Sequence, residues 1–305
     1  MIGFLGAGRV GAQAALEVAS AGIDDVTLVD IASGLAEGEA MDISQKIAET
    51  GVDVDVRGST DFSSLRGSKI VVITAGLARK PGMTRMDLLE KNAGIVSAVA
   101  KEVAKHAPGC IALTVTNPMD VMNYVVLRKT GFPKGKVVGM GGILDLSRFK
   151  STLCAMLDIS HSSITSLVIG EHGESMLPLA RFTSVGGVPL TTLMDETQIA
   201  QAMDATRRIA IDVISKKGAT VDAPANGVVR MVKAIAWDRK EVIPASAYLE
   251  GEYGVNGLCI GVPLVLGGNG VERILSLDLS EKEKAQFSKG AQTIREGIAA
   301  IQGSL

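Results

Sequence analysis

Short apolar runs alternate with longer amphipathic stretches through the first half of the chain. Six runs rich in valine, isoleucine and leucine predict strands, at residues 2–5, 26–29, 52–56, 69–74, 111–115 and 136–138. Apolar positions at helical spacing between them predict helices at residues 10–21, 34–49, 85–106 and 119–129. Most of the strand runs are apolar at successive positions, which is typical of strands covered on both faces. The pattern therefore predicts a doubly wound parallel α/β sheet.

The pattern changes after residue 138, where Gly139, Gly141 and Gly142 lie close together. Beyond them, helices are predicted at residues 146–157, 194–216, 225–237 and 281–301, mixed with short strands. A chain of 305 residues also exceeds the size at which one hydrophobic core usually stops growing. We therefore expect two domains, the parallel sheet over residues 1–142 and a mixed α/β (α+β) domain over residues 143–305.

Two helix starts can be read directly from the sequence. Thr84 is followed three residues later by Asp87, and Ser280 by Glu283. In this spacing the hydroxyl accepts a hydrogen bond from a free amide of the first helical turn, while the carboxylate binds back to the cap. The first of these predicted capping boxes makes Arg85 the first residue of its helix.

Composition and charge narrow the classes of partner. The formal net charge is -2 and basic residues form no long run, so we expect no nucleic-acid partner. The longest apolar run, residues 257–266, is shorter than the roughly 20 residues that span a bilayer. The N-terminus also lacks the basic start and unbroken apolar segment of a signal peptide. We expect no membrane association and a cytoplasmic location.

Three cysteines, Cys110, Cys154 and Cys259, lie far apart in apolar surroundings. Their number is odd and their spacing matches no metal-binding motif. We interpret them as buried free thiols in a reducing compartment, and we expect no metal site.

A glycine-rich turn follows the first predicted strand and opens the first predicted helix. It consists of Gly6, Ala7, Gly8, Arg9, Val10 and Gly11. This GxGxxG pattern lets the backbone approach a pyrophosphate at the positive end of a helix, as in Rossmann-type domains. The second strand ends at Asp30, where a carboxylate can bind the ribose hydroxyls of NAD and would repel the extra phosphate of NADP. A simple turn residue at the end of the strand is the alternative interpretation of Asp30.

His172 is the natural acid–base candidate among three histidines. It lies between glycines in the segment Gly170-Glu171-His172-Gly173, whereas His106 and His161 lack comparable neighbours. An imidazole titrates near neutral pH and can exchange a proton with an alcohol. A hydrogen-bonded structural histidine is the alternative.

Two further segments carry polar groups at positions suited to a site. Asp145 and Arg148 are three residues apart near a predicted helix start, so both can point from one face of the helix. A surface ion pair would explain them equally well. Asn117 follows a buried strand, at the edge where open α/β sheets bind ligands, although Asn117-Pro118 could also be only a turn.

A loop with two arginines, Arg79 and Arg85, follows the fourth predicted strand. Arginine stays charged near neutral pH, and its planar fork matches a carboxylate in two parallel hydrogen bonds. The pair suggests a small, doubly anionic ligand. The alternative is a polar turn with two solvated charges.

Taken together, the motifs resemble the lactate/malate dehydrogenase superfamily, in particular its lactate-dehydrogenase-like branch. They occur in the family's order over nearly the whole chain: GAGRVG at 6–11, Asp30, ARKPGMTR at 78–85, Asn92, VTNP at 115–118, LDLSR at 144–148 and GEHG at 170–173. The resemblance implies a nucleotide-binding first domain and a mixed α/β second domain, with the active site between them. The implied activity is reversible oxidation of (S)-malate to oxaloacetate with NAD.

The resemblance also implies the residue roles. Those that bind NAD are Gly6, Ala7, Gly8, Arg9, Val10, Gly11, Asp30, Asn92, Val115, Thr116 and Asn117. His172 is the implied proton acceptor, with Asp145 behind it. Arg148 would bind the C1 carboxylate of the substrate, Asn117 and Arg85 its C2 oxygen, and Arg79 its C4 carboxylate. The loop at residues 76–84 is a candidate lid over the ligand.

Two other functions stay open at this point. Another 2-hydroxy-acid dehydrogenase, such as one acting on lactate, would share most of these motifs. A non-catalytic NAD-binding sensor would need only the glycine motif and Asp30. The helix at residues 34–49 resembles the segment that pairs subunits in this family, which implies a homodimer or homotetramer. Packing of the same apolar residues on their own sheet is the alternative.

Overall fold

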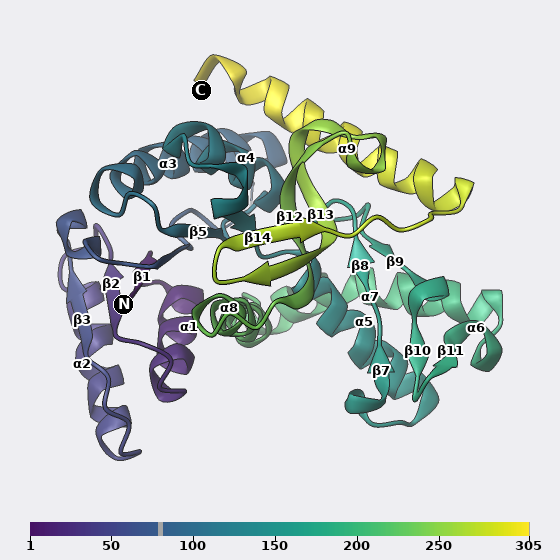
Figure 1. The fold of residues 1–305 in the computed structure, drawn as a ribbon, viewed down its shortest axis with the longest axis horizontal. Helices are drawn as coiled ribbons and strands as arrows, with labels where there is room; N and C mark the ends of the chain where they lie inside the picture. The colour runs from purple at the N-terminus through teal and green to yellow at the C-terminus, as the bar shows by residue number, and fades with distance from the viewer. Residues whose placement is uncertain (79–81, 305) are drawn as a thin grey trace.

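The computed structural model of the protein describes residues 1–78 and 82–304 (Figure 1). Nine strands of the described chain form one sheet, in the order β14-β13-β12-β6-β5-β4-β1-β2-β3. Its parallel strands are β1 (Ile2–Leu5), β2 (Val26–Val29), β3 (Val56–Ser59), β4 (Ile70–Ile73), β5 (Ile111–Thr114) and β6 (Val137–Gly139). Its antiparallel strands are β12 (Glu241–Glu250), β13 (Asn256–Gly267) and β14 (Gly270–Ile274).

The helices and remaining strands complete the element order. The α-helices are α1 (Arg9–Ser20), α2 (Leu35–Ala48), α3 (Arg85–His106), α4 (Met119–Thr130), α5 (Gly142–Leu157), α6 (Leu190–Leu193), α7 (Glu196–Lys217), α8 (Asp222–Ala236) and α9 (Glu281–Ile301). Short strands form two small sheets: β7 (Ile164–Thr165), β8 (Val168–Ile169), β9 (Leu177–Pro178), β10 (Ser184–Val185) and β11 (Val188–Pro189). The 3-10 turns are η1 (Phe62–Leu65), η2 (Lys134–Lys136), η3 (His161–Ser163), η4 (Ala180–Phe182), η5 (Glu252–Gly254) and η6 (Gln302–Ser304).

The parallel half confirms the predicted doubly wound sheet. Its order places β1 beside β4, so the chain reverses direction across the sheet between these two strands. Ligands of such sheets bind outside the carboxyl ends of the strands at this switch point. Strands β1, β2, β4 and β5 are fully buried, which explains their continuous apolar runs.

The strand predicted at residues 52–56 is wrong in its position. Pairing with β2 begins only at Val56, and the strand runs from there to Ser59. This is the edge of the sheet, where Val52 and Val54 are half-buried without joining the ladder. A Cβ on Gly58 would overlap the backbone of Ala36 in α2, so the true strand contains a glycine because α2 lies close to it. The close packing of α2, rather than an apolar pattern, determines where this strand lies.

The second half of the chain extends the same sheet. The long β12–β13 hairpin joins the parallel strands through an antiparallel pairing of Ser246 with Gly139 in β6. Helix α5 begins at Gly142, four residues before the predicted start at residue 146. Its N-cap, Gly141, has no side-chain capping bond, so the usual sequence signal for a helix start is missing.

Helices cover both faces of the sheet. Figure 1 shows α3, α4 and α9 on one side and α1 with α8 on the other, in agreement with their contacts. The small sheets, α5, α6 and α7 form a lobe at the far end, with its own apolar core around Phe149, Leu153 and Leu190. All three cysteines are buried free thiols. Within the described ranges, no helix is long and apolar enough to cross a membrane.

Candidate active site

The glycine-rich turn forms an open cradle at the start of α1. Gly6 has φ +103°, which an L-residue rarely adopts, and a Cβ on Gly11 would overlap the carbonyl oxygen of Gly6. At Gly8, by contrast, no atom lies within 4 Å of the position of a Cβ. Gly8 is the N-cap of α1 and makes no side-chain capping bond, so amides at this helix end are available to an anion. This geometry fits the pyrophosphate of a dinucleotide.

Asp30 lies beside that cradle. One carboxylate oxygen accepts a hydrogen bond from the backbone N–H of Ala7 at 2.8 Å, and the other accepts from Ala32 at 2.9 Å. The side chain is therefore fixed next to the glycine turn, where a bound nucleotide would carry its ribose. A residue that only ended the strand in a turn would not need the hydrogen bond from Ala7, 23 residues away in the sequence.

Asn92 is fully buried, and its side chain forms hydrogen bonds with backbone groups of the protein. Its amide nitrogen donates to the carbonyl oxygens of Leu77 and Asn117, and its oxygen accepts from the N–H of Leu77 at 2.7 Å. Thr116 is also buried, and its hydroxyl donates to the carbonyl of Ala75 at 2.8 Å. Asn92 thus ties two loops at the carboxyl edge of the sheet, and its role in NAD binding stays a prediction. Asn117 itself stays exposed at that edge, with Val115 half-buried before it.

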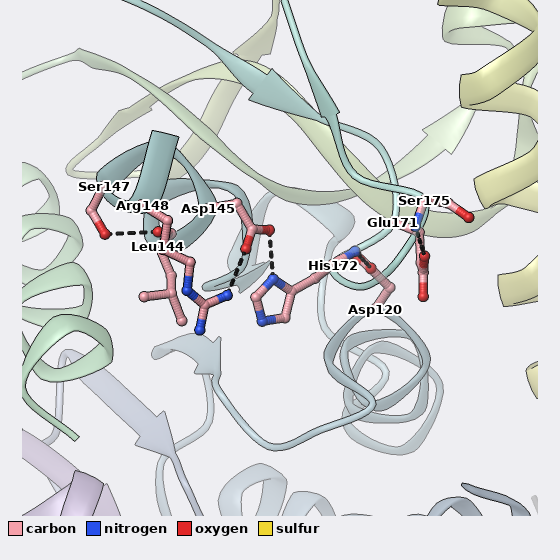
Figure 2. Close-up of polar contacts among 8 residues, drawn as sticks. All are labelled: Asp120, Leu144, Asp145, Ser147, Arg148, Glu171, His172 and Ser175. Atoms are coloured by element: carbon pink, nitrogen blue, oxygen red, sulfur yellow. Dashed lines mark hydrogen bonds and ion pairs between the residues drawn. The ribbon is translucent and has the colours of Figure 1, made fainter. Parts of the chain in front are cut away.

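The structure brings His172, Asp145 and Arg148 into one cluster (Figure 2). His172 Nδ1 lies 2.7 Å from one oxygen of Asp145, and Arg148 Nη1 donates to the other at 3.0 Å. Asp145 is 2% exposed, and the other two side chains are 11% exposed. The pair at residues 145 and 148 is therefore a buried network joined to His172, rather than a surface ion pair.

Local structure explains how these residues meet. Asp145 lies in the first turn of α5, and Arg148 follows one turn later on the same face. His172 lies on the loop after β8, which turns at Gly170 with φ +89° and is held to β13 by the Gly170–Gly261 bridge. A Cβ on Gly141 would come within 3.0 Å of His172 Cβ, so the start of α5 also fits closely against the histidine.

The electrostatics of the cluster suit a proton acceptor. Burial alone would lower the pKa of His172, but the adjacent Asp145 carboxylate outweighs burial, and the pKa lies above its ordinary value. Because Asp145 accepts from Nδ1–H, the neutral ring carries its lone pair on Nε2. Among the described residues, no hydrogen bond occupies Nε2. Asp145 would also stabilise the imidazolium after Nε2 takes a proton.

Arg85 contacts the histidine loop through Glu174. The capping box of Thr84 and Asp87 is confirmed, and Arg85 is the first residue of α3. Its guanidinium forms an ion pair with Glu174, two residues after His172. Both side chains are largely exposed, so this contact is weak. Arg79, the other arginine of the predicted loop, lies outside the described residues.

One buried residue of the site was missed in the sequence. Asp120, in the first turn of α4, is 3% exposed, and its carboxylate accepts from the backbone N–H of His172 at 2.7 Å. The available signal was a charged residue within the apolar run from Met119 to Met122. A carboxyl group is rarely buried without a specific partner.

A sheet with this order, a glycine cradle and a buried histidine–carboxylate cluster at its carboxyl edge define a two-domain, nucleotide-binding dehydrogenase. Two family models match the chain: lactate/malate dehydrogenase, NAD binding domain, over residues 1–139, and lactate/malate dehydrogenase, alpha/beta C-terminal domain, over residues 143–303. The chain belongs to the lactate/malate dehydrogenase family.

Individual relatives agree with this assignment. The malate dehydrogenase of Halalkalibacterium halodurans is 42% identical over 98% of this chain and 97% of its own. The structure of malate dehydrogenase from Aeropyrum pernix superposes with a TM-score of 0.95 at 41% identity, covering 98% of this chain and 97% of that one. The lactate dehydrogenase of Cryptosporidium parvum, solved with lactic acid and nicotinamide adenine dinucleotide, also reaches 0.95, at 35% identity over 99% of this chain and 97% of that one. The fold alone therefore does not separate the two substrates.

Proposed function

We propose that this protein catalyses the reversible, NAD-dependent oxidation of (S)-malate to oxaloacetate. The observation that carries the proposal is the buried cluster of His172, Asp145 and Arg148, which combines a proton acceptor with a carboxylate-binding cation. Full-length similarity to malate dehydrogenases at about 40% identity supports the same activity. A non-catalytic sensor would leave this network without a purpose.

Each side chain of the cluster has a chemical task in this reaction. His172 Nε2 accepts the hydroxyl proton of malate, and Asp145 stabilises the resulting imidazolium. NAD, when bound in the glycine cradle, supplies the acceptor for the hydride that leaves C2. In the reverse direction, the imidazolium returns the proton to the C2 oxygen as negative charge develops there.

Three side chains would orient the substrate in this reaction. Arg148 donates only one of its hydrogen bonds to Asp145 among the described residues, so the rest of its planar fork can bind the C1 carboxylate in a bidentate manner. Asn117, three residues beyond β5, and Arg85, at the start of α3, would bind the C2 oxygen. Because Arg85 is paired with Glu174, it would have to exchange this partner for the substrate.

The choice between malate and lactate depends on Arg79 in this proposal. A C4 carboxylate would pair with Arg79, whereas lactate would leave that charge without a partner in the closed site. Leaving a buried charge unpaired costs about 3 to 5 kcal/mol, which corresponds to a preference of roughly two to three and a half orders of magnitude. We therefore expect oxaloacetate to be strongly preferred over pyruvate.

Asp30 supports NAD rather than NADP as the cofactor. Its carboxylate is fixed beside the glycine turn, where the phosphate of NADP would meet a like charge. We also propose a homodimer or homotetramer that pairs through α2, where Met41 is 65% exposed. A domain boundary at Gly142 and a cytoplasmic location remain parts of the proposal.

One set of initial rates tests the function. Oxaloacetate and pyruvate are each reduced with NADH and with NADPH, on a single preparation whose cofactor binding is measured in parallel. The proposal predicts fast turnover only with oxaloacetate and NADH. Faster reduction of pyruvate would favour a lactate dehydrogenase, and NADH binding without any turnover would favour a sensor.

A further inference from the structure

We infer that Asp120 is a positioning residue, which sets the place of His172 by binding the backbone of its loop to the start of α4. This inference rests on the proposed function, because that function gives His172 the proton transfer. Asp120 touches neither the substrate nor the cofactor in this account. It acts entirely through His172.

The contact is direct and buried. Asp120 Oδ2 accepts from the backbone N–H of His172 at 2.7 Å, across 52 residues of sequence. Figure 2 shows the two carboxylates at opposite ends of His172: Asp145 at the ring and Asp120 at the backbone nitrogen. Asp145 orients the imidazole, but it cannot by itself fix where the backbone of a loop lies. The Gly170–Gly261 bridge holds the start of the loop, and the Asp120 carboxylate adds a restraint at residue 172 itself.

The same contact links two parts of the proposed site. Asp120 is three residues beyond Asn117, and the Asn117 carbonyl is held by Asn92 from α3. The hydrogen bond to Asp120 therefore sets His172, from the second half of the chain, against the segment that would bind the C2 oxygen. Proton transfer requires the acceptor and that oxygen to be within hydrogen-bond reach. An error of about 1 Å in such an alignment can cost 10²-fold in rate.

The charge of Asp120 also acts on His172. Burial raises the pKa of Asp120 to about 7, and the hydrogen bond from His172 counteracts this only in part. The ionisable groups that face it are His172, Glu171 and Cys259, and no described residue forms an ion pair with it. Its negative charge favours the imidazolium of His172, in the same direction as Asp145 but more weakly. Position and charge can therefore be separated by substitution.

Two variants and a matched control make this separation. Asp120→Asn keeps an oxygen acceptor for the His172 amide but removes the charge, whereas Asp120→Ala removes both. Asn123→Ala is the control, because Asn123 is fully buried one turn along α4 and donates to the carbonyl of Ser246 rather than to the histidine loop. We expect this variant to lower the melting temperature and to leave the hydrogen bond from the His172 amide to Asp120 in place.

Selective labelling with 15N-histidine gives direct readouts, because the chain holds only three histidines. We expect the backbone amide of His172 to lose its hydrogen-bonded shift in Asp120→Ala and to keep it in Asp120→Asn. The pKa of the His172 ring should fall in Asp120→Asn, because the Asp120 carboxylate favours the imidazolium. The kcat for oxaloacetate reduction should fall about 10²-fold in Asp120→Ala and less than about tenfold in Asp120→Asn, with NADH affinity unchanged.

Several outcomes would overturn the inference. These are an unchanged His172 amide in Asp120→Ala, a kcat loss no larger than that of Asn123→Ala, or no rescue of kcat by Asp120→Asn. The proposed function fails separately, if the wild-type protein turns over neither substrate. In that case the amide shift and the ring pKa still decide whether Asp120 positions His172.

Discussion

Replacing Asp145 with asparagine removes one of the two hydrogen bonds that this residue accepts. The carboxylate binds His172 Nδ1 with one oxygen and Arg148 Nη1 with the other, at 2.7 and 3.0 Å. An asparagine has a single acceptor oxygen, and a charge-assisted bond to the guanidinium is the stronger of the two. The amide nitrogen would then face His172 Nδ1 as a donor. The ring would adopt the tautomer with hydrogen on Nε2, which cannot accept a proton.

The size of the effect follows from this tautomer change. A comparable substitution in a histidine–aspartate pair lowers kcat by about 10⁴-fold while leaving the geometry intact. We expect a loss of roughly 10³- to 10⁴-fold in malate oxidation by Asp145→Asn, equivalent to about 4 to 5.5 kcal/mol of activation free energy. The pKa of His172 should also fall, because Asp145 is the main group that raises it.

The assay is steady-state malate oxidation at saturating NAD, with NADH affinity measured by fluorescence. Asp158→Asn is the matched control, since Asp158 caps the other end of α5 in a left-handed conformation that asparagine tolerates. The control should retain wild-type kcat, and both variants should bind NADH normally. A kcat for Asp145→Asn within tenfold of wild type would refute the role of Asp145 in fixing the tautomer.

Three further expectations concern substrate choice, pH dependence and the glycine turn. Arg79→Gln should narrow or reverse the preference for oxaloacetate over pyruvate. An unchanged ratio of the kcat/KM values for these two substrates would show that Arg79 does not select between them. Malate oxidation needs neutral His172, so its kcat/KM should fall as the pH drops through the raised pKa of that ring. Oxaloacetate reduction needs the imidazolium, so its kcat/KM should fall as the pH rises through the same pKa. pH profiles that do not change in these opposite directions would argue against His172 as the acceptor. Gly11→Ala should weaken NADH binding and lower the melting temperature, because its Cβ would overlap the Gly6 carbonyl, and calorimetry showing wild-type values for both would contradict the close packing.

Local patterns in the sequence were enough to predict much of the fold. Helix α3 and helix α9 begin and end at the predicted residues, because each has a capping box and a regular apolar face. The strands β1 and β2 also match their predicted limits. In each case the deciding interactions lie within a few residues of one another.

Contacts between distant segments could not be predicted from such local patterns. The addition of β12 to the parallel sheet depends on the pairing of Ser246 with Gly139, which no local signal encodes. The hydrogen bonds of Asn92 join it to Leu77 and Asn117, which lie 15 and 25 residues away in the sequence, so no local pattern indicates them. Asp120 was missed because its partner, the amide of His172, lies 52 residues away. Such roles can be assigned only from the structure, because sequence spacing does not indicate hydrogen bonds between distant segments.

The site motifs lie between these two cases. Asp145 and Arg148 were predicted to share a helix face, but only the structure distinguishes a buried network with His172 from a surface pair. For Asp30, the bond from Ala7 fixes the side chain at the glycine cradle. The sequence indicated which residues could form the site, and the packing of α5 against the histidine loop determines how they meet.

In the proposed mechanism, His172 performs the proton transfer on a dicarboxylate substrate. This role is tested by comparing oxaloacetate reduction by the wild-type protein and by His172→Ala, both saturated with NADH. We predict that the variant loses at least about 10³-fold in kcat and binds NADH as the wild type does. Wild-type turnover in His172→Ala would contradict the account.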